Sequence, residues 1–386
     1  MSPAPPFNDQ DAAVATQSWL NRPGFRHAAY DLAYPGAAFR IGSPQTREQR
    51  EDYLVTHLNA GATFVKGAGN RRLPEAPDPV RTCFERDRDR ILHSLAFRRL
   101  AEKTQVFAFP NAEQRTRLTH TLEVAQIARG LAEALGLNTA LVEAQALAHD
   151  CGHTPGGHAG EEAFATYLPE GFNHAIWGAE VTLLPLNLCQ ETLDGVRNHS
   201  WSQPRPQTPE GALVRYADRF AYACHDLVDA VQSGLIPATE IPASITSVLG
   251  NRQSRQIGTL MQDVVDTAQK HQIIGLSHEV ADALSALRTF NYEKIYRTPM
   301  AQAQMCAVVK MLRALVEYYL THPETLPPLP PELDEIHAIV AHLSAMTDPM
   351  VCRLAVDLLQ WPLESMPHGF FPLTEYVDFG NVIPPS

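Results

Sequence analysis

The chain has 386 residues, of which 45% are hydrophobic, and a formal net charge of -12. This is enough to bury a sizeable core, and we expect one helical body with appendages rather than two separate domains. The negative charge argues against a general nucleic-acid-coating protein, because such binding depends on lysines and arginines that neutralise phosphates.

The six cysteines are scattered without a CxxC pair, which favours a reducing compartment. The N-terminus shows no basic leader followed by an apolar run, and no stretch reaches the roughly 18 apolar residues of a membrane helix. We therefore expect a cytoplasmic protein without a membrane partner.

Residues 1–65 mix proline, glycine and aromatic residues without a sustained period, so we predict a variable N-terminal arm there. From Phe84 onward, apolar residues recur at helical spacing among basic ones. Between Arg81 and Arg117 there are nine lysines or arginines against five acidic residues. This local excess suits a polyphosphate pocket, although from charge alone a solvated amphipathic helix is the commoner explanation.

Two helices and a loop follow. Residues 118–135 predict an amphipathic helix that carries His120 near its start, and residues 141–148 predict a short apolar helix that ends at His149 and Asp150. Residues 151–158 contain three glycines and a proline, which predicts a loop. A polar cluster at the end of a buried helix is costly unless its groups find partners, and metal coordination would supply them.

Another helix is predicted over residues 211–233, with a polar stripe on one face. Its members are spaced three and four residues apart, and they are Asp218, Tyr222, His225, Asp226 and Asp229. Such a stripe either faces solvent, which is the commoner case, or lines a wet pocket. Tyr222 within the stripe favours the pocket.

Beyond residue 250, helical spacing continues over residues 273–296, 300–320 and 332–359, and strand-like alternation is rare. The predicted fold class is therefore all-α. We divide the chain into the arm (1–65), a histidine-bearing core (66–235) and a helical C-terminal region packed on that core (236–386). No GxGxxG or Walker loop is present.

Two imidazoles and two carboxylates form the predicted metal site, namely His120, His149, Asp150 and Asp218. Such an N2O2 set suits one divalent ion (Mn, Fe, Co, Ni, Zn or hydrated Mg), and we favour Mn or Mg. The adjacent pair His225 and Asp226 is assigned no metal, because an isolated His-Asp pair is weak evidence. The complete pattern, from His120 through the glycine-rich loop to Asp218, is the specific signal and predicts a metal-dependent hydrolase.

These residues carry a resemblance over about residues 66–360. The matching segments are 87–94 (DRDRILHS), 96–100 (AFRRL), 103–107 (KTQVF), 115–124 (RTRLTHTLEV), 149–153 (HDCGH), 157–161 (GHAGE), 172–174 (FNH), 216–219 (YADR), 292–296 (YEKIY) and 345–348 (AMTD). The sequence resembles the HD-domain superfamily of metal-dependent phosphohydrolases, and within it the bacterial deoxyguanosine triphosphate triphosphohydrolase-like family.

The resemblance implies an HD-domain helical fold with additional C-terminal helices, and residues 66–235 would be its catalytic core. It also implies hydrolysis of a deoxynucleoside triphosphate, dGTP being the first candidate, to deoxynucleoside and tripolyphosphate. His120, His149, Asp150 and Asp218 would be the metal ligands. The catalytic side chains would be His153, His158, Glu161 and His174, with His158 and His174 as an unranked pair of candidate acids.

The resemblance further assigns substrate contacts. Gln105 and Asp226 match positions that contact the sugar 3′ hydroxyl, Tyr222 matches a tyrosine beneath the sugar, and Arg117 matches an arginine near the phosphates. Relatives form oligomers and are activated by a second nucleotide or by single-stranded DNA, so we expect a homo-oligomer with these allosteric partners. Without the resemblance, ordinary packing would explain Tyr222 and Gln105.

The chain also departs from the family pattern. Gly156 follows the loop proline where an aromatic residue is usual, the residues after His174 differ, and Ala341 and His342 stand where Asp and Tyr are preferred. These changes bear on which base is accepted. The alternatives to a dNTP hydrolase are another HD-type phosphomonoesterase or phosphodiesterase, and a nucleotide-sensing protein with little turnover.

Overall fold

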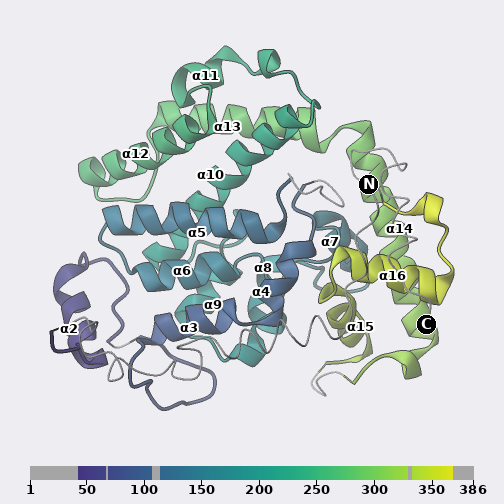
Figure 1. Cartoon of the computed structure of the whole chain (residues 1–386), viewed down its shortest axis with the longest axis horizontal. Coiled ribbons are helices and arrows are strands. Elements are labelled where there is room, and N and C mark those ends of the chain that lie inside the picture. The colour runs from purple at the N-terminus through teal and green to yellow at the C-terminus, as the bar shows by residue number, and fades with distance from the viewer. Residues whose placement is uncertain (1–41, 67, 107–113, 329–332, 368–386) are drawn as a thin grey trace, which may run out of the picture. The chain divides into compact units, whose positions relative to one another are not determined.

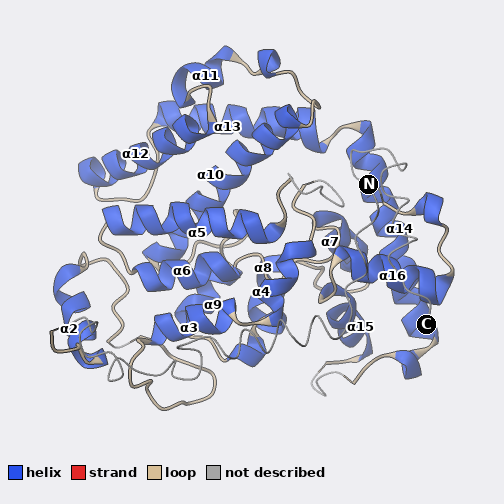
Figure 2. Cartoon of the chain, viewed as in Figure 1, coloured by secondary structure: helices blue, strands red, loops and turns tan. Residues whose placement is uncertain are grey.

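The computed structural model describes residues 42–66, 68–106, 114–328 and 333–367 (Figure 1). The chain divides into two compact units, residues 1–46 and 47–386, and the fold below is that of the second. Most of the predicted N-terminal arm lies outside the described residues. Among those described there is no β-strand, and the two isolated β-bridges join Arg71 to Cys189 and Thr104 to Thr116 (Figure 2). The all-α prediction is confirmed.

The first half of the unit contains α2 (Arg47–His57), α3 (Cys83–Leu92), α4 (Leu95–Arg99), η2 (Leu100–Glu102), α5 (Arg117–Ala134), α6 (Thr139–Ala148), α7 (His158–Ala165), α8 (His174–Trp177), η3 (Gly178–Thr182), η4 (Leu184–Leu186) and α9 (Gln190–Arg197). The label η denotes a short 3₁₀-helix, except that η3 and η6 are π-helical. The second half contains α10 (Pro209–Gln232), η5 (Ala238–Glu240), α11 (Ala243–Leu249), α12 (Gln253–His271), α13 (His278–Asn291), η6 (Tyr292–Tyr296), α14 (Pro299–Thr321), η7 (Pro323–Thr325), α15 (Glu335–Ser344), α16 (Asp348–Leu359) and η8 (Leu363–Ser365).

Helices α5, α6 and α10 form the centre of the fold. Helix α5 packs against both α6 and α10, and α3 and α9 cover α6 (Figure 1). The contacts are apolar: Leu131, Val142 and Phe220 are completely buried in one cluster. Helices α11 to α13 extend this cluster along α10. The candidate site lies where the start of α5 and the end of α6 meet the polar face of α10.

The C-terminal helices form a second cluster. Helix α14 packs on α7, and α15 and α16 pack on α14. The sequence predicted one helix over residues 332–359, but the chain bends by 120° between α15 and α16. Pro349, in the first turn of α16, has no N–H to continue the preceding helix, and Thr347 before it is extended. This break places Asp348 in the interior.

Among the described helices, none is long and apolar enough to cross a membrane alone. The bent pair α15 and α16 meets those criteria only when both helices are taken together.

Candidate functional site

Three helices bring the four predicted metal ligands to one place. His120 lies in the first turn of α5, His149 and Asp150 directly follow α6, and Asp218 lies in the middle of α10. The Nε2 atom of His120 is 3.2 Å from Oδ1 of Asp218. The Nε2 atom of His149 is 3.4 Å from Oδ1 of Asp150 and 3.8 Å from Oδ1 of Asp218. His120, His149 and Asp150 are buried, with at most 3% of each exposed.

The His149 ring is oriented as a metal ligand would be. Its Nδ1–H donates to the carbonyl of Ala146 at 2.7 Å, which leaves the Nε2 lone pair directed at the carboxylates. That Nε2 atom is buried and makes no hydrogen bond with any described residue. A buried unpaired acceptor facing two carboxylates is unfavourable unless a cation lies between them. The donor set therefore fits a divalent ion.

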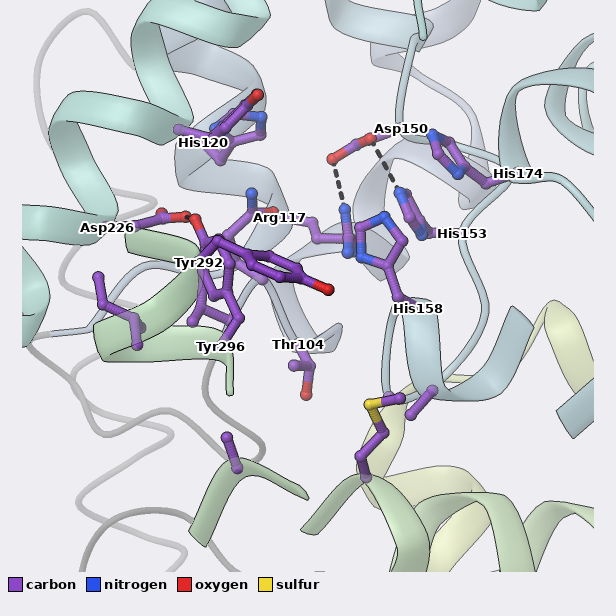
Figure 3. Close-up of a pocket in the computed structure, with 18 of the residues that line it drawn as sticks. Thr104, Arg117, His120, Asp150, His153, His158, His174, Asp226, Tyr292 and Tyr296 are labelled. Carbon is purple, nitrogen blue, oxygen red and sulfur yellow. Dashed lines mark hydrogen bonds and ion pairs between the residues drawn. The ribbon is translucent and has the colours of Figure 1, made fainter. Parts of the chain in front are cut away.

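Asp150 connects the ligand set to the rest of the pocket. Its Oδ2 accepts a hydrogen bond from Nη1 of Arg117 at 2.8 Å, and its Oδ1 lies 3.3 Å from Nε2 of His153 (Figure 3). Burial raises the pKa of Asp150, but the neighbouring positive charge of Arg117 opposes this shift, and the pKa lies well below its usual value. The carboxylate is thus ionised, as a metal ligand must be.

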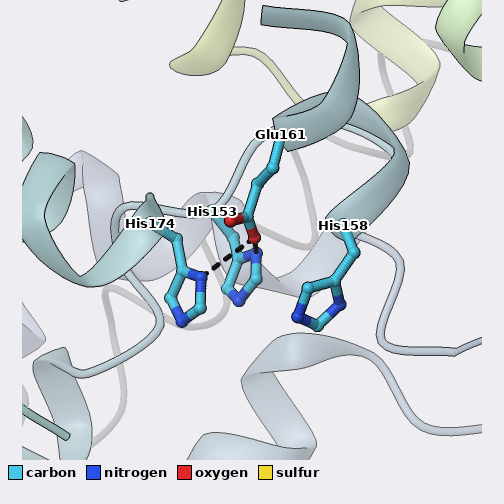
Figure 4. A group of neighbouring side chains, drawn as sticks. All are labelled: His153, His158, Glu161 and His174. Atoms are coloured by element: carbon cyan, nitrogen blue, oxygen red, sulfur yellow. Dashed lines mark hydrogen bonds and ion pairs between the residues drawn. The ribbon is translucent and has the colours of Figure 1, made fainter. Parts of the chain in front are cut away.

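A second histidine group lies beside this set. Oε1 of Glu161 is 2.9 Å from Nδ1 of His174 and 3.1 Å from Nδ1 of His153, and the two rings stack with centroids 3.7 Å apart (Figure 4). His158 faces both rings edge-on. Its side chain is exposed, and neither ring nitrogen makes a hydrogen bond or ion pair with a described residue. Within this group, only His158 has both ring nitrogens without a hydrogen-bond or ion-pair partner among the described residues.

Glycine at position 152 is required for this arrangement. A Cβ atom on Gly152 would lie 2.1 Å from the carbonyl oxygen of His174 and 2.4 Å from the backbone nitrogen of Gly178. No side chain fits there. The close approach of these backbones brings α8, and with it His174, against the loop that carries His153.

All four predicted substrate contacts, Gln105, Arg117, Tyr222 and Asp226, line one cavity of about 710 Å³. Three of the four predicted metal ligands, His120, Asp150 and Asp218, line the same cavity, as do the three histidines of the second group. The size of the cavity suits a nucleotide. The polar stripe of α10 is divided between the cavity and buried ion pairs with neighbouring residues. Tyr222 and Asp226 line the cavity, whereas His225 pairs with Glu123 at 2.7 Å and Asp229 pairs with Arg115.

Sequence reasoning gave no role to several cavity-lining residues, among them four polar or charged ones. His199 follows α9, donates its Nδ1–H to the carbonyl of Val196 at 2.7 Å and places Nε2 3.2 Å from Nε2 of His174. Tyr296 donates its hydroxyl hydrogen to Asp226. The remaining two are the cations Arg219 and Arg288. Arg219 and Tyr296 lie within segments that match the family, but the resemblance assigned them no role. Nothing in the sequence analysis pointed to His199 or Arg288.

Arg219 is held by an aromatic platform. Its guanidinium carbon lies 3.7 Å from the centroid of Trp201, and the indole N–H of Trp201 donates to the carbonyl of Arg215 at 3.1 Å. The Nε atom of Arg219 is buried without a hydrogen-bond partner, as are Nε and Nη2 of Arg117. Guanidinium N–H groups that have no partner are suited to bind an anion.

Asp226 yields a pH-dependent prediction. Burial raises the pKa of Asp226 from 3.8 to about 7, with the Tyr296 hydrogen bond opposing this shift. The folded protein thus retains a proton that the unfolded chain releases above pH 3.8, so stability must fall as pH rises towards 7. The test is urea unfolding of wild type and Asp226→Asn in the presence of a metal chelator. We expect the free energy of unfolding of wild type, relative to that of the variant, to fall from about pH 5 to about pH 7. A difference that grows in favour of wild type over this range would contradict the assignment.

Comparisons with known proteins place the chain among families that are already described. Residues 117–223 match the HD domain, and residues 274–356 match the phosphohydrolase-associated domain. The chain is 39% identical over 345 residues to the deoxyguanosinetriphosphate triphosphohydrolase-like protein of Desulfatibacillum aliphaticivorans, covering 84% of this chain and 97% of that one. It is 38% identical to the protein of the same name from Caldanaerobacter subterraneus subsp. tengcongensis, covering 79% and 93%. A crystal structure of a hypothetical protein from Aquifex aeolicus aligns with a TM-score of 0.46 at 18% identity, covering 72% and 69%.

Proposed function

Because the chain belongs to the HD-domain phosphohydrolases of the deoxyguanosinetriphosphate triphosphohydrolase-like family, we propose that it hydrolyses deoxynucleoside triphosphates. The products would be a deoxynucleoside and tripolyphosphate, and dGTP is the first substrate to test.

One observation supports this proposal above the others. The cavity is lined by three residues of the N2O2 donor set and by Arg117 and Arg219, each of which has buried N–H groups without a hydrogen-bond partner. A single phosphate beside a divalent ion would not need cations on two separate helices, α5 and α10. A triphosphate chain would, because its charge extends over several ångströms.

The ligand set would hold the ion through His120, His149, Asp150 and Asp218. A divalent ion at this place would polarise the α-phosphoryl group and lower the pKa of a bound water. Arg117 would contact the phosphates and also hold Asp150 in place. His158 would donate a proton to the leaving 5′ oxygen, because a bound polyanion favours its imidazolium form.

The sugar side of the cavity would be formed by Tyr222, Gln105 and Asp226. The hydroxyl of Tyr222 accepts a hydrogen bond from Nε of Arg288 at 2.8 Å, so its ring is fixed. The Oε1 atom of Gln105 is buried without a partner and is available to a ligand hydroxyl. Loss of such a buried contact costs about 1–3 kcal/mol, which is enough to select among sugars.

The test is product analysis. Purified protein is incubated with each dNTP and Mn or Mg, and the products are separated by chromatography, with His149→Ala as the control for contaminating phosphatases. We expect deoxynucleoside and tripolyphosphate in equal amounts. Orthophosphate or a nucleotide as product would instead identify a phosphomonoesterase or phosphodiesterase. Thermal stabilisation by dNTPs and metal without any product would identify a nucleotide-sensing protein.

A further inference from the structure

The start of α16 is bonded to two separate loops that line the cavity. Oδ2 of Asp348 accepts hydrogen bonds from the backbone N–H of Thr104, at 2.9 Å, and from the Thr104 hydroxyl. Oδ1 of the same carboxylate accepts the backbone N–H of Gly156 at 2.9 Å. Thr104 belongs to the loop after η2, and Gly156 belongs to the loop before α7. One side chain therefore joins segments about 50 residues apart in the sequence.

The environment of Asp348 shows that this link is built into the interior. Only 5% of Asp348 is exposed, and the three groups that face its carboxylate are all donors. Next to it, the ammonium group of Lys103 donates to the carbonyl of His153 and, at 2.9 Å, to the carbonyl of Ser344. The same two loops are thus linked to the end of α15 as well as to the start of α16.

Both loops carry functional positions close to the residues that are bonded. Gln105, on the sugar side, directly follows Thr104. His158, on the leaving-group side, is two residues after Gly156. Gly156 has a φ of +69° and is enclosed on its other side by Val308 of α14, which a Cβ atom would approach to 2.4 Å. The N–H of Gly156 therefore has little freedom to find another acceptor.

We propose that Asp348 is a positioning residue that fixes the sugar-contacting loop relative to the leaving-group loop, so that the C-terminal helices are part of the catalytic unit. The carboxylate serves both loops at once because each of its oxygens is bonded to a different loop. The link itself is independent of the substrate. Its effect on turnover rests on the proposed function, which supplies the roles of Gln105 and His158.

The first test is hydrogen–deuterium exchange on the apo protein, comparing wild type with Asp348→Asn. The asparagine amide has one NH₂ group, which must face a hydrogen-bond donor of either Thr104 or Gly156. At least one of the hydrogen bonds to the two loops is therefore lost. We expect the amides of residues 103–106 and 153–158 to exchange at least about tenfold faster together. Asp334→Asn is the matched control, because Asp334 is the N-cap of α15. Its carboxylate accepts the backbone N–H of His337 at 2.9 Å and lies 2.7 Å from Nδ1 of the His337 ring. Unchanged exchange in either loop would overturn the proposal.

The second test measures selectivity, which does not depend on how much of the variant is folded. The ratio of kcat/KM for a dNTP to that for its 2′,3′-dideoxy analogue reports the contact with the 3′ hydroxyl. We expect Asp348→Asn to lower this ratio about tenfold while kcat also falls, and Asp334→Asn to preserve both. A lower kcat with an unchanged ratio would overturn the proposal. If wild type hydrolyses no dNTP, the proposed function fails, and the exchange experiment decides the role of Asp348 alone.

Discussion

Replacing Asp150 with alanine is expected to abolish divalent-ion binding and to destabilise the fold at the same time. The carboxylate is both a predicted metal ligand and the partner of Arg117, whose side chain is 2% exposed. Without it, the guanidinium group is buried and unpaired, which typically costs about 3–5 kcal/mol. Activity should fall by at least about a thousandfold, because the bound ion lowers the activation barrier by several kcal/mol.

His149→Ala separates these two effects. It removes a ligand of the same ion but leaves no charge unpaired, so metal affinity should fall while the loss in unfolding free energy stays smaller than for Asp150→Ala. Metal titration and urea unfolding of both variants measure this, with Asp357→Ala, an exposed acid on α16, as the reference. Wild-type metal affinity in both variants would refute the assigned ligand set.

Local sequence patterns predicted the central helices closely. Apolar spacing gave residues 118–135 and 211–233, and the structure has α5 over Arg117–Ala134 and α10 over Pro209–Gln232. The glycine-rich segment after Asp150 identified a sharp loop because such a run cannot continue a helix. These features depend on local backbone preferences and on a single buried face, and a sequence reports both directly.

Features that depend on tertiary contacts could not be predicted. His199 reaches His174 only because α9 ends beside α8, and no spacing in the sequence connects the two. The stripe on α10 is divided because Glu123 and Arg115, on or beside α5, pair with His225 and Asp229. A periodic pattern shows which residues share a helix face, but not which neighbouring element covers each part of it.

The geometry ranks the histidines that the sequence left unranked. Both ring nitrogens of His174 are engaged, by Glu161 and His199, and both of His153 face carboxylates, those of Glu161 and Asp150. The nitrogens of both rings are therefore directed at other protein groups. His158 has no such partner among the described residues and is the expected general acid, with His174 and His153 supporting it.

This ranking predicts how His158→Ala responds to the leaving group. With a dNTP, whose alkoxide must be protonated, kcat should fall by about 10²–10⁴-fold. With p-nitrophenyl triphosphate, whose phenolate leaves without a proton, the loss should be under about tenfold, because only positioning is affected. His174→Ala should slow both substrates similarly, since it disturbs the group bound to Glu161. The reverse pattern, with the leaving-group dependence in His174→Ala, would identify His174 as the acid and show that its bond to His199 breaks when substrate binds.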